Sequence, residues 1–257
     1  MPPASDGAFA AWLADHTGRM LQQLREDMGF TDPAALRAAG DKRAHEMLVE
    51  ELERWRSGDA VLSEEGVRDD PARLTSERVW IVDPLDGTRE FGEPGRSDWA
   101  VHVALWSRKT DSLVAGGVAL PAAHRLLSTD PPPSYPPLHP DVAAGGPIRI
   151  AASRTRPPSF LDALAERENA VLVPMGSAGA KIAAVITGEV DAYIHDGGQS
   201  EWDSAAPVAV ALGAGLHASR LDGGPLVYNR SDPSLPDLMV CRADLAARLL
   251  SALSHIR

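Results

Sequence analysis

The feature that most constrains this chain is a β-rich segment that runs directly into two aspartates. Residues 78–82 read Arg-Val-Trp-Ile-Val, which predicts a buried strand. We expect the strand to stop at Asp83-Pro84, because proline has no N–H to donate to a neighbouring strand. Asp86 follows three residues after Asp83, and Gly87 allows the backbone to approach a ligand closely. An Asp-Gly pair alone would indicate an ordinary turn, but the complete segment indicates a ligand site.

The residues after this turn add a place for an anion beside the two acids. Thr88 is predicted to begin a short helix, and free backbone N–H groups at a helix start attract negative charge. Carboxylate oxygens are hard ligands that select Mg²⁺, Mn²⁺ or Ca²⁺ rather than zinc or copper. Two such ions side by side can hold the attacking water and the leaving oxygen of a phosphoryl transfer. The segment therefore predicts metal-assisted chemistry on a phosphate.

Two further acidic segments lie upstream and downstream of this motif. Glu64 and Glu65 follow the short apolar run 60–62, which predicts a strand that delivers two acids at its end. Asp203 precedes a stretch of small residues predicted to be helical over 204–212. Taken alone, the first segment is typical of a solvated loop and Asp203 of a helix N-cap. Beside the Asp83 motif, both become candidate metal ligands.

Hydrophobic periodicity divides the chain into two halves with different patterns of elements. The first half predicts helices at 5–28 and 41–55 and strands at 60–62, 78–82, 99–106 and 116–120. The second half alternates strands at 148–152, 170–174 and 191–195 with helices at 159–168, 178–187 and 204–212, which is an α/β pattern. We therefore expect an N-terminal α+β metal-binding subdomain (1–130), a Pro/Gly-rich connection (131–147) and a C-terminal α/β subdomain (148–257).

The charge and the cysteine content exclude several classes of protein. The net charge is −11, so the chain would repel the phosphate backbone of a nucleic-acid polymer. Bound metal ions would reconcile this charge with a small anionic substrate. Cys241, the single cysteine, fits a reducing cytoplasm and excludes zinc–thiolate sites, and a small buried residue is its usual role. No secretory signal is expected. The sequence contains no apolar run of about eighteen residues, so no membrane span is expected either.

Together these segments resemble the inositol monophosphatase superfamily. The matching pieces are Asp83-Pro-Leu-Asp86-Gly-Thr88 with Phe91, the acidic pair at Glu64, Gly188-Glu-Val-Asp-Ala-Tyr193 and Trp202-Asp203-Ser-Ala-Ala. They occur in order over residues 41–224. The resemblance implies a mixed α/β and α+β fold, a layered α-β-α-β-α sandwich of the inositol monophosphatase and sugar phosphatase type. It also implies a homodimer.

The resemblance assigns the acids to metal ions. Glu64, Asp83 and the backbone carbonyl of Leu85 would bind one Mg²⁺, and Asp83, Asp86 and Asp203 would bind a second. Two or three ions are expected in all, and Mn²⁺ could replace Mg²⁺. Li⁺, Na⁺ or Ca²⁺ would be expected to inhibit.

Catalytic roles follow from the same resemblance. Gly87 and Thr88 would donate backbone N–H groups to the phosphate. Asp41, paired with Thr88, would help to activate water, and Glu64 would assist the same water. The chain departs from the family pattern at Ala38, where threonine is usual three residues before that aspartate.

The choice of substrate depends on the segment Gly176-Ser-Ala-Gly-Ala-Lys181. It is similar to the CysQ-type phosphatases, which remove the 3′-phosphate of 3′-phosphoadenosine 5′-phosphate, a by-product of sulfate assimilation, to give AMP. The 5′-phosphosulfate is a second expected substrate. Lys181 and Ser177 would bind the second anionic group, Asp203 would also contact substrate, and Arg154 would stack on adenine or hold the 5′-phosphate. An ion pair within the loop is the alternative for Arg154.

Other functions remain open within and outside the superfamily. Inositol-1-phosphate, fructose-1,6-bisphosphate and histidinol phosphate are alternative substrates, because the metal sites of those enzymes look alike. A regulatory module that binds metal or phosphate without catalysis would need a broken set of acids. A dinucleotide-binding oxidoreductase would need a G-x-G-x-x-G segment and a serine hydrolase a G-x-S-x-G segment, and the chain has neither.

Overall fold

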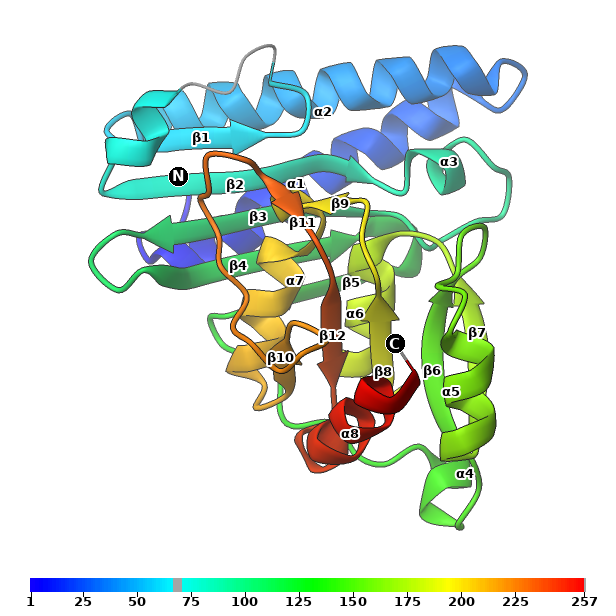
Figure 1. The fold of residues 1–257 in the computed structure, drawn as a ribbon. Coiled ribbons are helices and arrows are strands. Elements are labelled where there is room, and N and C mark those ends of the chain that lie inside the picture. The colour runs from blue at the N-terminus through cyan, green and yellow to red at the C-terminus, as the bar shows by residue number, and fades with distance from the viewer. Residues whose placement is uncertain (67–70, 257) are drawn as a thin grey trace.

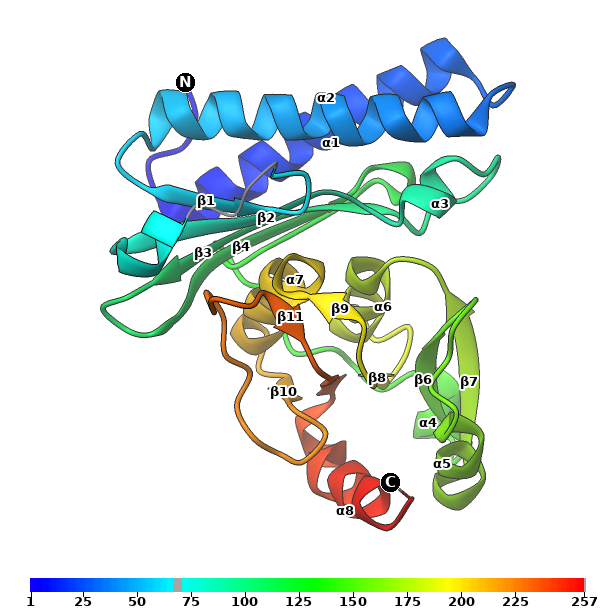
Figure 2. The ribbon, with the colours of Figure 1, turned by 45° about the horizontal axis from the view of Figure 1, so that its top comes forward.

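The architecture is a stack of five layers in which helices and β-sheets alternate (Figures 1 and 2). The structure is a computed structural model, and it describes residues 1–66 and 71–256. Within these residues two long helices cover one sheet, two helices lie between that sheet and a second one, and further helices cover the outer face of the second sheet. The predicted α-β-α-β-α sandwich is therefore confirmed.

The outermost layer consists of helices α1 (Asp6–Met28) and α2 (Pro33–Trp55). Ser5 caps α1, and its side chain accepts a hydrogen bond from the N–H of Ala8. The prediction that the second helix begins near residue 41 was wrong, because Asp32 accepts hydrogen bonds from the N–H groups of residues 34 and 35 and Pro33 fits the first helical position. Asp41 consequently lies inside a continuous helix rather than at its start.

The first sheet has the strand order β1-β2-β3-β4-β5. Its strands are β1 (Ala60–Ser63), β2 (Arg78–Asp86), β3 (Ala100–Ser107), β4 (Ser112–Leu120) and β5 (Arg125–Ser128). The prediction that the second strand stops at Asp83-Pro84 was wrong, since β2 continues to Asp86. Its pairing with β3 shifts register between Asp83 and Asp86. That irregularity accommodates the proline and keeps both aspartates in the sheet.

The second sheet has the order β10-β12-β8-β6-β7. Its strands are β6 (Ile148–Ser153), β7 (Ala170–Met175), β8 (Ala192–His195), β10 (His217–Ser219) and β12 (Leu238–Cys241). Between or beyond them lie α5 (Leu161–Glu168), α6 (Ala178–Ile186), α7 (Glu201–Gly213) and α8 (Ala246–Ile256). The predicted alternation of strands and helices is confirmed up to α7, and Cys241 is buried and free as expected.

Shorter elements join these layers. The predicted connection 131–147 contains the single-turn helix α4 (Pro140–Ala143), and β9 (Gln199–Ser200) pairs with β11 (Ser234–Leu235). The first sheet takes its strands from residues before this connection and the second from residues after it. The division into two subdomains remains a prediction. None of the helices described combines the length and the apolar character needed to cross a membrane.

The central helices are pressed closely against the first sheet, and this fixes the site. A side chain on Gly116 of β4 would meet the backbone oxygen of Ala206 in α7 at 2.8 Å, so only glycine permits this approach. Small residues dominate the buried face of α7, as the alanine-rich sequence predicts. The N-termini of α6 and α7 are thereby brought to the end of β2 where Asp83 and Asp86 lie.

Candidate active site

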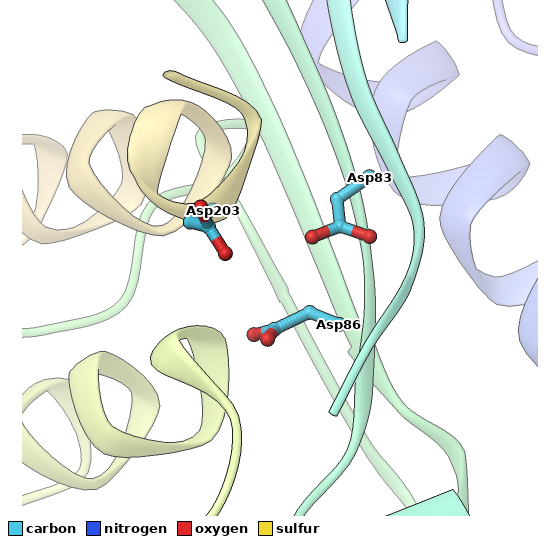
Figure 3. Close-up of side chains that lie close together, drawn as sticks. All are labelled: Asp83, Asp86 and Asp203. Atoms are coloured by element: carbon cyan, nitrogen blue, oxygen red, sulfur yellow. The ribbon is translucent and has the colours of Figure 1, made fainter. Parts of the chain in front are cut away.

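Three predicted acids converge where β2 faces the starts of two helices. Asp83 and Asp86 come from β2 and Asp203 from the first turn of α7, and their carboxylates face a common space (Figure 3). One oxygen from each lies within 4.8 Å of the others. Asp83 and Asp86 are both buried. Asp203 follows Asp86 by 117 residues in the sequence (203 − 86). The packing of α7 on the first sheet therefore brings it to the two aspartates of β2.

Asp86 is held by the beginning of α6. Its carboxylate accepts hydrogen bonds from Ser177 Oγ at 2.5 Å and from the N–H of Gly179 at 2.6 Å, and the N–H of Ala178 donates at 3.2 Å. These donors compensate one buried negative charge and fix the orientation of its oxygens. The ring of His102 lies on the same carboxylate, with Nε2 3.4 Å from Oδ2.

Asp203 lies inside α7, whereas we predicted it just before the helix. The helix begins at Glu201, and the Asp203 carboxylate accepts a hydrogen bond from the N–H of Ser200 at 2.6 Å. It therefore serves the helix start as the third residue of the first turn rather than as the N-cap. Burial and then the charge of Asp86 raise the pKa of Asp203 to about 7.

Glu64 lies at the edge of this cluster, just after β1. The residue as a whole is exposed, but its carboxyl end reaches Asp83 and forms a hydrogen bond with it. Desolvation is the largest cause that raises the pKa of Glu64 to about 7, and the charges of Asp86, Glu65 and Asp41 add to it. Burial, followed by the charges of Glu64 and Asp86, raises the pKa of Asp83 well above its usual range.

The ionised form of these buried acids would be more stable with a divalent cation bound between them than without one. Burial removes the water that would solvate their charges, and mutual repulsion opposes ionisation of the whole set. A cation that shares several carboxylate oxygens would remove both penalties. The ligands available are hard oxygens, the donor type that suits Mg²⁺, Ca²⁺ and Mn²⁺. The residues present therefore fit a metal centre made of Asp83, Asp86 and Asp203, with Glu64 beside it.

The predicted pair of Asp41 and Thr88 is also brought together. Thr88 Oγ1 lies 3.4 Å from Asp41 Oδ1 and 3.1 Å from the backbone oxygen of Leu85. Gly87 precedes it with φ of 83°, a left-handed conformation that favours glycine, and α3 (Thr88–Phe91) begins at Thr88 as predicted. Desolvation and then the charge of Glu65 raise the pKa of Asp41 to about 6.

An open cavity of about 490 Å³ adjoins the acids. One side is formed by residues 86–90 of the β2–α3 turn and by the start of α6. The facing side is formed by the loop 153–159 after β6, by Tyr193 and His195 of β8 and by residues 196–199 that follow it. The cavity is large enough for a small metabolite. Its lining includes seven of the predicted site residues, namely Asp86, Gly87, Thr88, Arg154, Ser177, Lys181 and Asp203.

Lys181 and Ser177 sit on the floor of this cavity, at the start of α6. Lys181 is only 5 % exposed, and its Nζ donates to the backbone oxygens of Ser177 at 2.6 Å and Gly176 at 3.2 Å. Desolvation lowers the pKa of Lys181, while the neighbouring charges of Asp86, Glu90 and Asp203 oppose that shift. Ser177 adopts φ of 47°, unusual for a residue with a side chain, and this conformation aims its hydroxyl at Asp86.

Arg154 lines the cavity but is engaged by two acids. Its Nη2 donates to Glu90 Oε1 at 2.6 Å and to Glu93 Oε1 at 3.0 Å. Those hydrogen bonds raise the pKa of Arg154, which stays fully charged. The structure therefore places Arg154 in the loop ion pair that was its alternative assignment. Its partners, however, lie in and just after α3 rather than within the loop. A contact between Arg154 and substrate remains a prediction.

Several residues that organise the site were not assigned to it from the sequence. Asp98 accepts a hydrogen bond from the N–H of Gly176 at 2.6 Å, which ties the residue before α6's N-cap to the segment just before β3. Glu90 is buried and holds Arg154 across the cavity. His102 Nδ1 donates to the backbone oxygen of Trp202 at 3.1 Å, because a carbonyl can only accept. Their signal was weak, since each partner lies far away in the sequence.

Comparisons with known proteins agree with this geometry. A model of the inositol monophosphatase family matches residues 11–131 and 141–256. The chain belongs to the inositol monophosphatase family. Membership confirms the predicted family and makes the chain a phosphatase of a metal-dependent family, in keeping with the acidic cluster.

Individual members of the inositol monophosphatase family show how close the likeness is. The 3′-phosphoadenosine 5′-phosphate phosphatase of Mycobacterium leprae (strain TN) is 50 % identical over 262 residues, which cover 98 % of this chain and 94 % of that protein. The 3′(2′),5′-bisphosphate nucleotidase CysQ of Escherichia coli (strain K12) is 29 % identical over 204 residues, covering 74 % and 78 %. The crystal structure of inositol monophosphatase-II from Staphylococcus aureus MSSA476 superimposes with a TM-score of 0.77 at 22 % identity, covering 95 % and 91 %.

Proposed function

We propose that this phosphatase hydrolyses the 3′-phosphate of 3′-phosphoadenosine 5′-phosphate to give AMP, and that it also accepts the corresponding 5′-phosphosulfate. The observation that carries the proposal is the convergence of Asp83, Asp86 and Asp203 beside a cavity that also contains Lys181. A cluster of acids alone would serve any phosphate monoester. The half-identical relative from M. leprae is named for this substrate, which favours a bisphosphorylated nucleoside over an inositol phosphate.

The metal proposed is Mg²⁺, with two or three ions bound. Asp83, Asp86 and Asp203 would hold one ion, and Glu64, Asp83 and the carbonyl of Leu85 another. Bound divalent ions would supply positive charge to the phosphoryl oxygens and would ease ionisation of water. Mn²⁺ is the expected substitute, and Li⁺, Na⁺ or Ca²⁺ are the expected inhibitors.

The groups of the chain that would handle the water are Asp41, Thr88 and Glu64. Hydrolysis breaks the bond from phosphorus to the 3′-oxygen, and a water oxygen takes its place. Thr88 Oγ1 has one proton and two acceptors in reach, so its lone pairs remain free to accept a hydrogen bond from that water. The proton of the water would pass through Thr88 to Asp41, whose carboxylate is ionised at neutral pH. Glu64 would accept a hydrogen bond from the same water.

Other residues would position the substrate. The backbone N–H groups of Gly87 and Thr88 would donate to the reacting phosphate. Lys181 lines the cavity and has one N–H beyond the two that it gives to backbone oxygens, which would donate to an anion. Ser177 and Asp203 line the same floor and would contact the ribose. The acids and the lysine thus present opposite charges to one small molecule.

A phosphate-release panel tests this assignment. The purified chain is assayed with Mg²⁺ on 3′-phosphoadenosine 5′-phosphate, inositol-1-phosphate, fructose-1,6-bisphosphate and histidinol phosphate, and again with a chelator. We expect the first substrate to give the highest kcat/KM and the chelator to abolish release on all four. A higher kcat/KM on any of the other three would overturn the substrate assignment, and release in the chelator would overturn the metal assignment.

Two further predictions concern the state of the protein in the cell. A homodimer is expected, and light scattering on the purified chain would measure its mass. A cytoplasmic location is expected from the lone buried Cys241 and from a substrate of intracellular metabolism. Fractionation of cells that express the chain would test that location.

A further inference from the structure

We propose that a buried histidine, His102, is the positioning residue that holds the three aspartates of the proposed metal centre at the spacing of a single ion. The inference rests on the proposed function, because it concerns the same acids. His102 belongs to β3, and its side chain is fully buried. It lies behind the acids, outside the lining of the cavity, so it would act through the acids rather than touch the substrate.

The pairing of β2 with β3 places His102 directly opposite Asp83. Side chains at opposite positions of an antiparallel pair project from the same face of the sheet. On this face, Ala100 and Ala104, two residues before and after His102, belong to the core between the first sheet and the helices α6 and α7. The histidine ring therefore stands beside Asp83, between the sheet and the two central helices.

The same ring also contacts Asp86 and the start of α6. Its Nε2 lies 3.4 Å from Asp86 Oδ2. A carbon added to Gly179 would come within 2.0 Å of that nitrogen, so the ring occupies the space that the glycine leaves in the first turn of α6. The N–H of Gly179 donates to the same oxygen of Asp86. The ring thus limits how far Asp86 and the start of α6 can move toward β3.

The other ring nitrogen holds the start of α7. Nδ1 of His102 donates to the backbone oxygen of Trp202 at 3.1 Å, one residue before Asp203. The first turn of α7 depends on such contacts, because Pro207 has no N–H to donate to the backbone oxygen of Asp203 four residues earlier. The hydrogen bond to Trp202 therefore fixes the stretch of backbone that carries the Asp203 carboxylate.

One residue thus supports all three carboxylates that face the common space in Figure 3. Mg²⁺ requires nearly ideal ligand geometry, so a small displacement of either helix start relative to β2 would weaken its binding. Core packing alone does not explain a histidine at position 102. Its Nε2 has no hydrogen-bond partner within residues 1–66 and 71–256, and a buried nitrogen without a partner lowers stability.

The test separates the hydrogen bond of His102 from the volume of its side chain. His102→Asn keeps an N–H donor near the position of Nδ1 but is smaller, whereas His102→Leu nearly keeps the volume and has no donor. Isothermal titration calorimetry with Mn²⁺ alone, on metal-free protein, measures binding without turnover. The Leu variant should bind Mn²⁺ about tenfold more weakly than the unaltered chain, and the Asn variant should bind it more tightly than the Leu variant.

Thermal unfolding of the same metal-free samples shows whether the effect is merely structural. The Asn variant leaves a cavity, so it should be the less stable of the two although it binds Mn²⁺ more tightly. Affinity and stability should therefore follow opposite orders. If His102 only filled the core, both would follow the same order, with the Leu variant above the Asn variant, and that result would overturn the inference.

His217→Leu is the matched control. His217 is partly buried and hydrogen-bonded to Ser219 Oγ, but it lies in β10 at the edge of the second sheet, so this variant should bind Mn²⁺ like the unaltered chain. Unchanged affinity in His102→Leu, or an equal loss in His217→Leu, would overturn the inference. Failure of the proposed function is distinguishable, because the unaltered chain itself would then bind no Mn²⁺ or release no phosphate from 3′-phosphoadenosine 5′-phosphate.

Discussion

The two ends of the cavity are built in different ways. At the acidic end Asp83, Asp86 and Asp203 are fixed by elements of regular structure, and Asp86 alone accepts three hydrogen bonds from the start of α6. At the facing end an exposed loop presents Arg154 and Arg156. The first end is built from a strand and two helix starts, whereas the second depends on loop residues. Under the proposed function, the acidic end would perform the chemistry and the facing end would contact the rest of the substrate.

Removal of one charge at the acidic end should give the largest effect. We expect Asp86→Asn to abolish turnover, a loss on the order of 10³-fold or more in kcat/KM, because it removes the charge of a proposed metal ligand with little change in shape. Phosphate release and thermal unfolding measured together separate lost chemistry from lost folding. Asp111→Asn, in the exposed turn between β3 and β4, is the matched control. Normal activity in Asp86→Asn would contradict the metal assignment.

The pair Asp41 and Thr88, proposed to activate water, should give the next largest effect. Asp41→Asn keeps the shape of the side chain but cannot accept a proton, so kcat should fall roughly 10²-fold while KM changes little. Steady-state kinetics on 3′-phosphoadenosine 5′-phosphate would measure both constants. Asp32→Asn is the control, because it makes the same exchange at the N-cap of the same helix, where asparagine caps equally well. A fall in kcat common to both variants would argue for helix damage instead.

A substitution that disturbs the packing of α6 should affect the acidic end indirectly, by lowering the stability of the folded protein. A side chain on Gly179 would meet Nε2 of the fully buried His102 at 2.0 Å, so Gly179→Ala must push α6 away from Asp86. We expect a loss of about 1–3 kcal/mol in the free energy of unfolding. Denaturant titration measures it, with Gly58→Ala as control, because no atom lies within 4 Å of that added carbon. Equal stability of the two variants would show that α6 is not packed as described.

The acids should make stability depend on pH in a direction set by the metal. Without metal, the raised pKa values of Asp203 and Glu64, both about 7, mean that the folded state holds protons that the unfolded state has lost. The stability of the metal-free protein should therefore fall as pH rises from about 4 to about 7. Metal needs the ionised carboxylates, so stabilisation by millimolar Mg²⁺ should grow over that range, reaching on the order of 5 °C in Tm.

Thermal unfolding with and without Mg²⁺, at about pH 5.5 and about pH 8, measures this prediction. Asp203→Asn should shrink the Mg²⁺ increment at the higher pH, because one ligand carboxylate is removed. An increment that is larger at the lower pH, or one that Asp203→Asn leaves unchanged, would contradict the metal centre as described.

The sequence pointed to three acids that do converge, Asp83, Asp86 and Asp203, because their signals are local. Asp83 and Asp86 follow a β-rich run, and the small residues after Asp203 favour a closely packed helix. The wrong predictions, for the end of β2 and the start of α2, arose where a contact in the structure overrides a preference of the local sequence. β2 continues past Pro84 because the pairing with β3 shifts register there, and α2 begins early because Asp32 caps it.

The facing end could not be predicted in the same way. The loop 153–156 contains two arginines, and nothing in its local pattern says which one is neutralised. Glu90 and Glu93 are more than sixty residues upstream of Arg154, and only the packed structure brings them together. The partners of Asp98 and His102 are similarly distant. Residues that depend on contacts between distant segments need the fold before they can be assigned.

The most direct measurement for the central claim is crystallography of the chain with Mn²⁺, in which anomalous scattering locates the metal. The account predicts at least one Mn²⁺ bound by oxygens of Asp83, Asp86 and Asp203, with an anion in the adjoining cavity when inorganic phosphate is added. Ions bound elsewhere, with these three carboxylates left without metal, would contradict it.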